Sequence, residues 1–184
     1  MTELESALLE VASLIERLSI PYMLIGGLAV AAWGEPRATL DVDLSLWVEP
    51  DRLDQTVTDL SMALRPLPQN PTNFVRSSRV LPVLANSGVR IDLVFASLPM
   101  EADLINRAKP IEVAGKVIPV ASVEDIIWMK LISERKKDLE DAQGLLRRHR
   151  HSVDRKYLES RLSELAEALA RPDVLDVLQR ELDA

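Results

Sequence analysis

The sequence contains no cysteine and only two histidines among its 184 residues. Without cysteine the chain has no disulfide bonds and no thiolate metal sites. Two histidines are too few for a histidine-rich ligand set, which weighs against a metal-dependent phosphohydrolase. The three tryptophans are interpreted as packing residues rather than as platforms for stacked bases: Trp33, Trp47 and Trp128.

Long apolar runs are also missing. No stretch of about 18 apolar residues occurs, so no membrane-spanning helix is expected. The acidic start Met1–Glu5 is not typical of a signal peptide, and a cytoplasmic location is therefore expected. The content of 47% hydrophobic and 28% charged residues is that of an ordinary globular protein with a buried core.

The net charge of −7 excludes a surface that is basic throughout. Charge reverses locally in residues 134–156, where eight Lys and Arg against five Asp and Glu give +3. Such a segment is typical either of a solvated helical face or of a surface that meets a phosphate backbone.

Hydrophobic periodicity and turn signals predict a mixed α+β unit in residues 1–121 and an all-helical tail in residues 122–184. The fold class expected is a small mixed β-sheet flanked by helices. Predicted strands cover 22–25, 41–48, 79–85, 89–96, 111–113 and 117–120, predicted helices cover 3–18, 28–33, 50–64, 99–107, 123–132, 137–148, 153–170 and the residues after Pro172, and a loop is predicted over 65–78.

Three carboxylates mark the predicted strands. Asp41 and Asp43 are two positions apart, so their side chains point to the same face, opposite the apolar side chains of the even positions. Asp92 lies within the apolar run 89–95. Neighbouring like charges favour a divalent cation such as Mg²⁺, which prefers oxygen ligands. Two simpler interpretations stay open: Asp41 and Asp43 are solvated, or Arg90 pairs with Asp92.

Gly26 and Gly27 stand between a predicted strand and a predicted helix. Glycine allows a tight turn, and it also lets a ligand phosphate approach main-chain N–H groups without a Cβ in the way. Alone, the pair predicts only a turn.

These residues together carry a family resemblance. Gly26-Gly27, thirteen further residues and then Asp41-Val42-Asp43-Leu44 resemble the signature of the DNA-polymerase-β-like nucleotidyltransferases. The longer stretches 24–34 and 37–44, with helical segments 122–131 and 135–141, resemble the AbiEii-type nucleotidyltransferase-like proteins. Many of those are toxins of toxin–antitoxin pairs.

The resemblance implies a site and an activity. Asp41, Asp43 and Asp92 would hold two Mg²⁺ ions, with Mn²⁺ as a substitute, and Gly26 and Gly27 would cradle the phosphates of a nucleoside triphosphate. The reaction would move a nucleoside monophosphate to an acceptor hydroxyl, with RNA such as a tRNA 3′ end as the expected acceptor. A protein hydroxyl or an antibiotic would serve the same chemistry. A cognate antitoxin protein would be the partner. The alternative is a non-catalytic nucleotide-binding or protein-interaction module.

Further candidates lie beside the signature and in the tail. Arg37 and Thr39 precede the carboxylates and would either touch the triphosphate or order the turn. Lys130 ends an apolar helical face and would either reach a phosphate or extend from the edge of the core to solvent.

The helix predicted at 137–148 adds a charged group. Arg135 and Lys137 would contact phosphate, with Asp138 orienting one of them. Local ion pairing, including an i,i+4 pair of Lys137 with Asp141, is the simpler interpretation. His149 and His151 are interpreted as surface residues.

Overall fold

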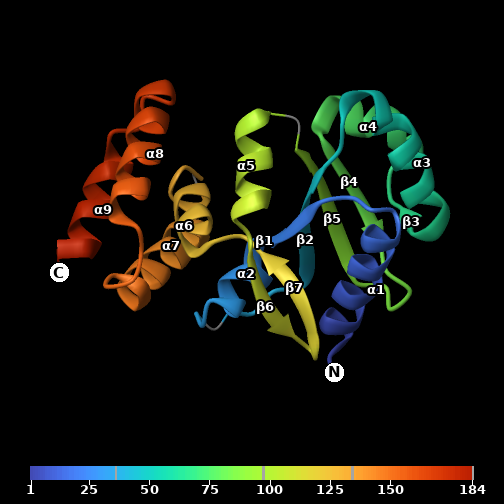
Figure 1. Cartoon of the computed structure of the whole chain (residues 1–184), viewed down its shortest axis with the longest axis horizontal. Coiled ribbons are helices and arrows are strands. Elements are labelled where there is room, and N and C mark those ends of the chain that lie inside the picture. The colour runs from blue at the N-terminus through green and yellow to red at the C-terminus, as the bar shows by residue number, and fades with distance from the viewer. Residues whose placement is uncertain (36, 97, 134, 184) are drawn as a thin grey trace. The chain divides into compact units, whose positions relative to one another are not determined.

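The computed structural model describes residues 1–35, 37–96, 98–133 and 135–183. The chain forms two compact units: unit 1 comprises residues 1–32 and 37–121, and unit 2 comprises residues 33–36 and 122–184. Figure 1 colours unit 1 from blue to yellow and the four helices of unit 2 from orange to red. Among the described residues, none of the helices has the length and apolar character needed to cross a bilayer.

Unit 1 is built on a mixed sheet of seven strands in the order β3-β4-β5-β2-β1-β7-β6. Strand β2 lies near the middle, antiparallel to β1 and parallel to β5, while β4 and β5 form an antiparallel hairpin. The strands are β1 (Tyr22–Ile25), β2 (Asp41–Trp47), β3 (Arg65–Pro66), β4 (Val80–Leu84), β5 (Arg90–Ala96), β6 (Lys109–Val113) and β7 (Lys116–Val120).

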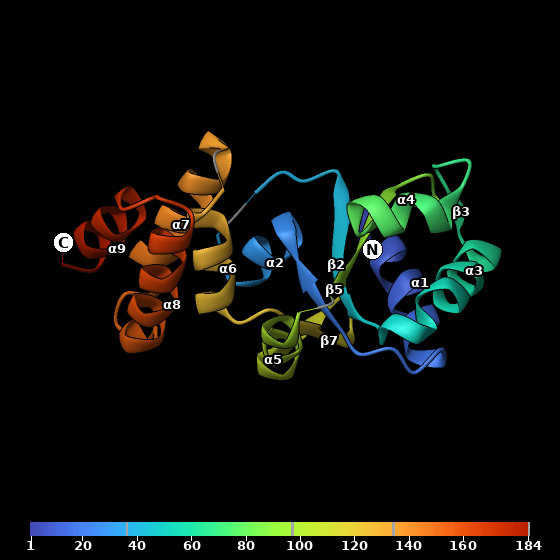
Figure 2. The same ribbon diagram turned by 90° about the horizontal axis from the view of Figure 1, so that it is seen from above.

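Helices cover both faces of this sheet. Helices α1, α3 and α4 lie on one side of the sheet, and α2 and α5 lie on the other. Figures 1 and 2 both show this arrangement. Helix α1 begins with a capping box in which the Thr2 hydroxyl accepts from the Glu5 N–H at 3.1 Å. The helices are α1 (Glu3–Arg17), α2 (Gly26–Ala32), α3 (Leu53–Ala63), α4 (Pro71–Ser78) and α5 (Pro99–Arg107), with one 3₁₀ turn (Pro50–Arg52) before α3.

Strand β2 divides its side chains between the core and a polar face. Val42, Leu44 and Leu46 are fully buried, because alternate residues of a strand point to the same side and this side faces the core. Asp41 and Asp43 point to the opposite side and are half-buried. The alternation read from the sequence is confirmed by this strand.

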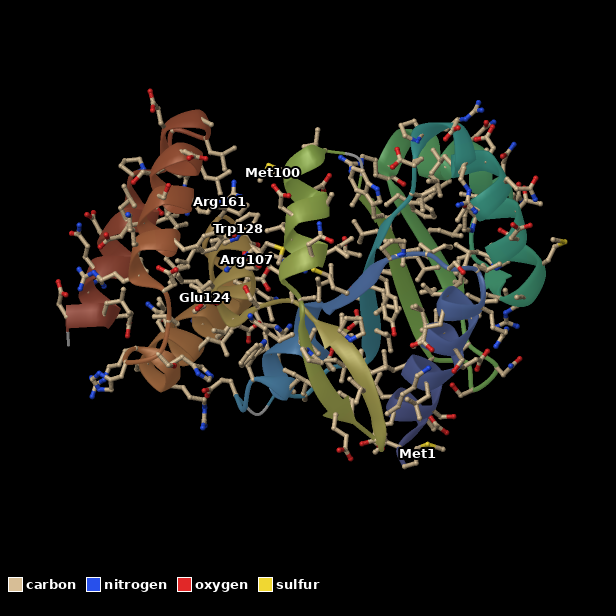
Figure 3. The ribbon with its side chains drawn as sticks, in the orientation of Figure 1. Met1, Met100, Arg107, Glu124, Trp128 and Arg161 are labelled. Atoms are coloured by element: carbon tan, nitrogen blue, oxygen red, sulfur yellow. The ribbon has the colours of Figure 1, made fainter. Side chains whose placement is uncertain are left out.

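Unit 2 consists of α6 (Val123–Leu131), α7 (Lys136–His149), α8 (Arg155–Ala168) and α9 (Asp173–Asp183). A buried carboxylate joins two of them: Asp125 of α6 accepts from the Ser122 hydroxyl at 2.7 Å, the Trp128 indole N–H at 3.2 Å and the Tyr157 hydroxyl of α8 at 2.6 Å. Figure 3 labels Trp128 on α6 and Arg161 on α8, whose guanidinium lies 5.6 Å from the centre of the Tyr157 ring. The polar bonds of Asp125 thus fix α6 against α8.

The predicted fold class is confirmed, with two local corrections. The segment 65–78 is not a loop, because it contains β3 and α4. Helix α4 has a typical N-terminus. The side chain of the N-cap residue Asn70 accepts a hydrogen bond from the Asn73 N–H at 3.1 Å, and Pro71 lies in the first turn. Gly26 and Gly27 do not form a separate turn either; α2 begins at Gly26.

Candidate active site

The register of β2 and β5 brings four charged side chains onto one face of unit 1. In this parallel pair Asp43 is the Cα partner of Asp92, and Asp41 is the Cα partner of Arg90. Residues two apart on a strand share a face. All three predicted carboxylates therefore lie on the same side of the sheet, with one arginine among them.

Arg90 binds the third carboxylate with both ends of its guanidinium fork. Its Nε donates to Asp92 Oδ1 at 2.9 Å and its Nη2 donates to Asp92 Oδ2 at 3.1 Å. The hydrogen bond to Asp92 and the charge of that carboxylate raise the pKa of Arg90, and the negative charges of Asp41 and Asp43 act in the same direction. The alternative interpretation from the sequence, an Arg90–Asp92 ion pair, is therefore present in the structure.

Asp41 is held by the residues just before β2. The Thr39 hydroxyl donates to Asp41 Oδ1 at 2.8 Å. Thr39 also packs on Gly27, where an added Cβ would lie 2.7 Å from Thr39 Oγ1 and 3.5 Å from Arg37 Nε. Thr39 and Gly27 thus order the start of β2, and contact of Arg37 or Thr39 with a triphosphate stays a prediction.

Asp43 packs directly over Gly26. Gly26 has a φ of +69°, and an added Cβ would lie 1.9 Å from Asp43 Oδ2. The backbone conformation and the approach of the carboxylate both require a residue without a side chain here. Gly26 is therefore needed by Asp43, whether or not its N–H group binds a phosphate.

The three carboxylates suit a divalent metal by residue type, and their arrangement is not yet that of a metal site. Three carboxylates on one face are the donors that Mg²⁺ prefers, and Gly26 leaves Asp43 the space to lie there. In the described part of the chain, no three His, Cys, Asp or Glu side chains are arranged as they stand to hold a metal ion. Asp92 would have to exchange its bond to Arg90 for a bond to the metal.

The candidates in unit 2 form a buried ionic cluster. The Lys130 ammonium donates to Asp138 and lies 3.3 Å from Asp141 Oδ2, and all three residues are at most 9% exposed. Asp138 Oδ2 also accepts from the Ser133 hydroxyl at 2.7 Å and from Arg135 Nε at 2.6 Å. Arg135 and Asp138 thus form a local ion pair. The orienting role of Asp138 and the phosphate contacts of Lys130, Arg135 and the exposed Lys137 stay predictions.

Opposing effects act on the pKa of Asp138. Burial is the largest of them and raises the pKa, but the hydrogen bonds from Lys130, Ser133 and Arg135 together with the Lys130 charge outweigh it and hold the pKa below its ordinary value. Asp138 is thus an ionised carboxylate. Ser133 was not singled out from the sequence, because no spacing rule marks a serine five residues before an aspartate. Glu134 of the basic segment lies outside the described residues.

A family model described as "Nucleotidyltransferase of unknown function (DUF6036)" matches residues 2–173. The chain belongs to this family. Nearly the whole chain is covered, so the nucleotidyltransferase resemblance read from Gly26-Gly27 and Asp41-Val42-Asp43 is confirmed at that level. The AbiEii-type assignment stays a prediction. No curated protein sequence matches this nucleotidyltransferase.

Solved structures share the fold at low sequence identity. The antibiotic-resistance factor ANT(2'')-Ia in solution matches with a TM-score of 0.62 and 16% identity over 90% of this chain and 92% of its own. A nucleotidyltransferase-like protein from Paracoccidioides brasiliensis matches with a TM-score of 0.59 and 19% identity over 96% and 92%. The lincosamide antibiotic adenylyltransferase LnuA, bound to lincomycin, matches with 0.50 and 15% over 79% and 96%. The fold is therefore that of nucleotidyltransferases.

Replacing Gly26 by alanine is expected to destabilise unit 1 and displace Asp43. Gly88 provides a matched control, because its φ is +83° but nothing lies within 4 Å of an added Cβ. Gly88→Ala should cost about 1 kcal/mol from backbone strain alone, and Gly26→Ala should cost clearly more. Urea unfolding of both variants measures the difference, and equal losses would contradict the close packing of Asp43 on Gly26.

Unit 2 is expected to lose stability in acid through Asp138. Its pKa is lowered in the folded state, so the stabilisation is fully present above the unfolded carboxyl pKa of about 3.9 and is lost as the pH falls through the lower folded value. Asp138→Asn should remove this part of the acid dependence. Urea unfolding between pH 3 and pH 7 measures this pH dependence of the free energy of unfolding. Glu140→Gln, at an exposed position of the same helix, is the control. An Asp138→Asn variant that loses as much stability in acid as the unsubstituted chain would contradict the prediction.

Proposed function

We propose that the chain transfers a nucleoside monophosphate from a nucleoside triphosphate to an acceptor hydroxyl, with Mg²⁺ held by Asp41, Asp43 and Asp92. The observation that carries this proposal is the β2–β5 register, which sets Asp43 opposite Asp92 on the face that also presents Asp41. Membership of a nucleotidyltransferase family supports the reaction class. Two metal ions, with Mn²⁺ as a substitute, are the expected complement.

The chemistry follows from these positions. The acceptor oxygen attacks the α-phosphorus, its bond to phosphorus forms as the bond to the bridging oxygen breaks, and pyrophosphate leaves. Asp92 takes the acceptor proton. Main-chain N–H groups at Gly26 and Gly27 hold phosphate oxygens of the triphosphate. Asp41, Asp43 and Asp92 would hold Mg²⁺, whose Lewis acidity would lower the pKa of the acceptor hydroxyl and stabilise the charge on the leaving pyrophosphate.

A groove at the starts of β2 and β5 is a candidate surface for the acceptor. It has a volume of about 560 Å³, a size typical of small-molecule sites, and Thr39 and Arg90, which bind Asp41 and Asp92, both line it. Leu40 in this groove is 89% exposed. The charged lining residues are Glu3 and Arg90, one of each sign, whereas a polynucleotide needs several cations along its backbone. A small hydroxyl-bearing molecule with an apolar part suits this lining.

RNA remains the alternative acceptor, and the basic segment after Arg135 is what favours it. A toxin role with a cognate antitoxin belongs to the same alternative. ANT(2'')-Ia has been solved with adenylyl-2''-tobramycin, and LnuA is an antibiotic adenylyltransferase, so two proteins of this fold act on small molecules.

A non-catalytic module is the second candidate function. The observation that favours it is the Arg90 fork on Asp92, which gives the third carboxylate a structural partner. Such a module would bind nucleotide and release no pyrophosphate.

Transfer is expected to require the paired carboxylates. The full chain is incubated with each α-³²P-labelled nucleoside triphosphate and Mg²⁺, in separate reactions with total RNA and with a panel of aminoglycosides and lincosamides. Asp41→Asn and Asp43→Asn should each reduce label transfer by at least about a thousandfold, because each removes a metal-binding charge. Equal label transfer by the variants would overturn the assignment, and nucleotide binding without any transfer would favour the non-catalytic module. Label in RNA, falling steeply with salt, would identify RNA as the acceptor.

The groove is tested through Leu40. Leu40→Ser is expected to raise the KM for the acceptor by about five- to tenfold through lost apolar contact, with the KM for the nucleotide unchanged. Met62→Ser is the control, because Met62 is 75% exposed and lies on α3 away from the groove lining. An unchanged acceptor KM in Leu40→Ser would place the acceptor elsewhere.

A further inference from the structure

Arg90 provides the counter-charge at the carboxylate face. Asp41, Asp43 and Asp92 lie on one face of two adjacent strands, and neighbouring like charges repel one another. Arg90 starts β5 directly opposite Asp41 and binds both oxygens of Asp92. It thus meets the electrostatic need that a divalent cation would otherwise meet.

We infer that Arg90 is a tethered cation that occupies Asp92 when no divalent metal is bound, and that it lowers the affinity of the site for the metal alone. The inference rests on the proposed metal-binding role of Asp41, Asp43 and Asp92. Arg90 is a positioning residue in this scheme, since it acts on the metal through Asp92.

Replacement of Arg90 by a metal ion at Asp92 requires movement of the Arg90 side chain only. The side chain of Arg90 is 53% exposed and that of Asp92 is 20% exposed, so the guanidinium can leave toward solvent while the carboxylate stays in place. The backbone of β5 is held on both sides by β2 and β4, and a change of the Arg90 rotamer breaks none of those bonds. Solvent screens a partly exposed ion pair of this kind, so a divalent cation can displace the guanidinium from Asp92.

The first measurement is the affinity of the full chain for Mn²⁺ in the absence of nucleotide. Electron paramagnetic resonance detects the bound and free Mn²⁺. Arg90→Gln is expected to bind Mn²⁺ on the order of tenfold more tightly than the unsubstituted chain, because it removes both the competitor and a positive charge. The Mn²⁺ affinity of Arg90→Lys should lie between those of Arg90→Gln and the unsubstituted chain, since a lysine binds Asp92 at one point only.

Arg76→Gln is the matched control. Arg76 also binds a carboxylate, Asp54, with both its Nε and its Nη2, and the two side chains are 58% and 53% exposed. Its removal should leave the Mn²⁺ affinity unchanged. A tighter site in Arg90→Gln and not in Arg76→Gln supports the inference, whereas equal affinities in Arg90→Gln and the unsubstituted chain overturn it.

The second measurement is the thermal midpoint in EDTA and in Mg²⁺. Arg90→Gln should melt lower in EDTA, because Asp92 then loses the cation that binds both its oxygens, and Mg²⁺ should raise the midpoint of Arg90→Gln by more than that of the unsubstituted chain. An equal rise of the thermal midpoint with Mg²⁺ in Arg90→Gln and in the unsubstituted chain overturns the inference.

These readouts separate the two proposals. Metal binding that tightens in Arg90→Gln, in a chain that transfers no nucleotide to any acceptor, would keep the role of Arg90 and remove the proposed reaction. If the unsubstituted chain and both Arg90 variants bind no Mn²⁺, the role of Arg90 and the metal site are overturned together.

Discussion

The parallel pairing of β2 with β5 is the constraint on which the candidate site depends. It places Asp43 opposite Asp92 and Asp41 opposite Arg90, so that acidic side chains from segments about fifty residues apart in sequence share one polar face. Because the other face of β2 is fully buried, a shift of one residue would turn Val42 and Leu44 to the polar side and the carboxylates into the core. The hydrophobic core therefore fixes the register that the chemistry requires.

Several features of unit 1 follow from that register. Asp43 needs a residue without a side chain beneath it, which explains Gly26, and Asp41 needs a donor at the start of the strand, which Thr39 provides. The excess negative charge needs a cation, and Arg90 supplies it. Gly26 and Gly27 thus have a packing role in unit 1, and their phosphate contacts stay a prediction.

Unit 2 contains a buried ionic cluster of its own. Lys130 is buried and has Asp138 and Asp141 within ion-pair distance, while Ser133 and Arg135 complete the bonds of Asp138. Removing one member of a buried ionic group leaves the others uncompensated, which is far more costly than the net value of the group. This arrangement joins α6 to α7, and it gives Lys130 a structural role beside any contact with a nucleotide.

The sequence by itself determined the fold class, most element boundaries and the shared face of Asp41 and Asp43, because alternation, caps and turn residues act over a few positions. It also carried the motif that identifies the nucleotidyltransferase family. The helix in 71–78 had a readable signal in Asn70 and Pro71, but three nearby prolines suggested a loop. Only the tertiary structure decided that Asp92 stands opposite Asp43, that Arg90 binds it, and that Lys130 is paired and buried. Those facts depend on which strands and helices become neighbours, and contacts between distant segments leave no periodic trace in the chain.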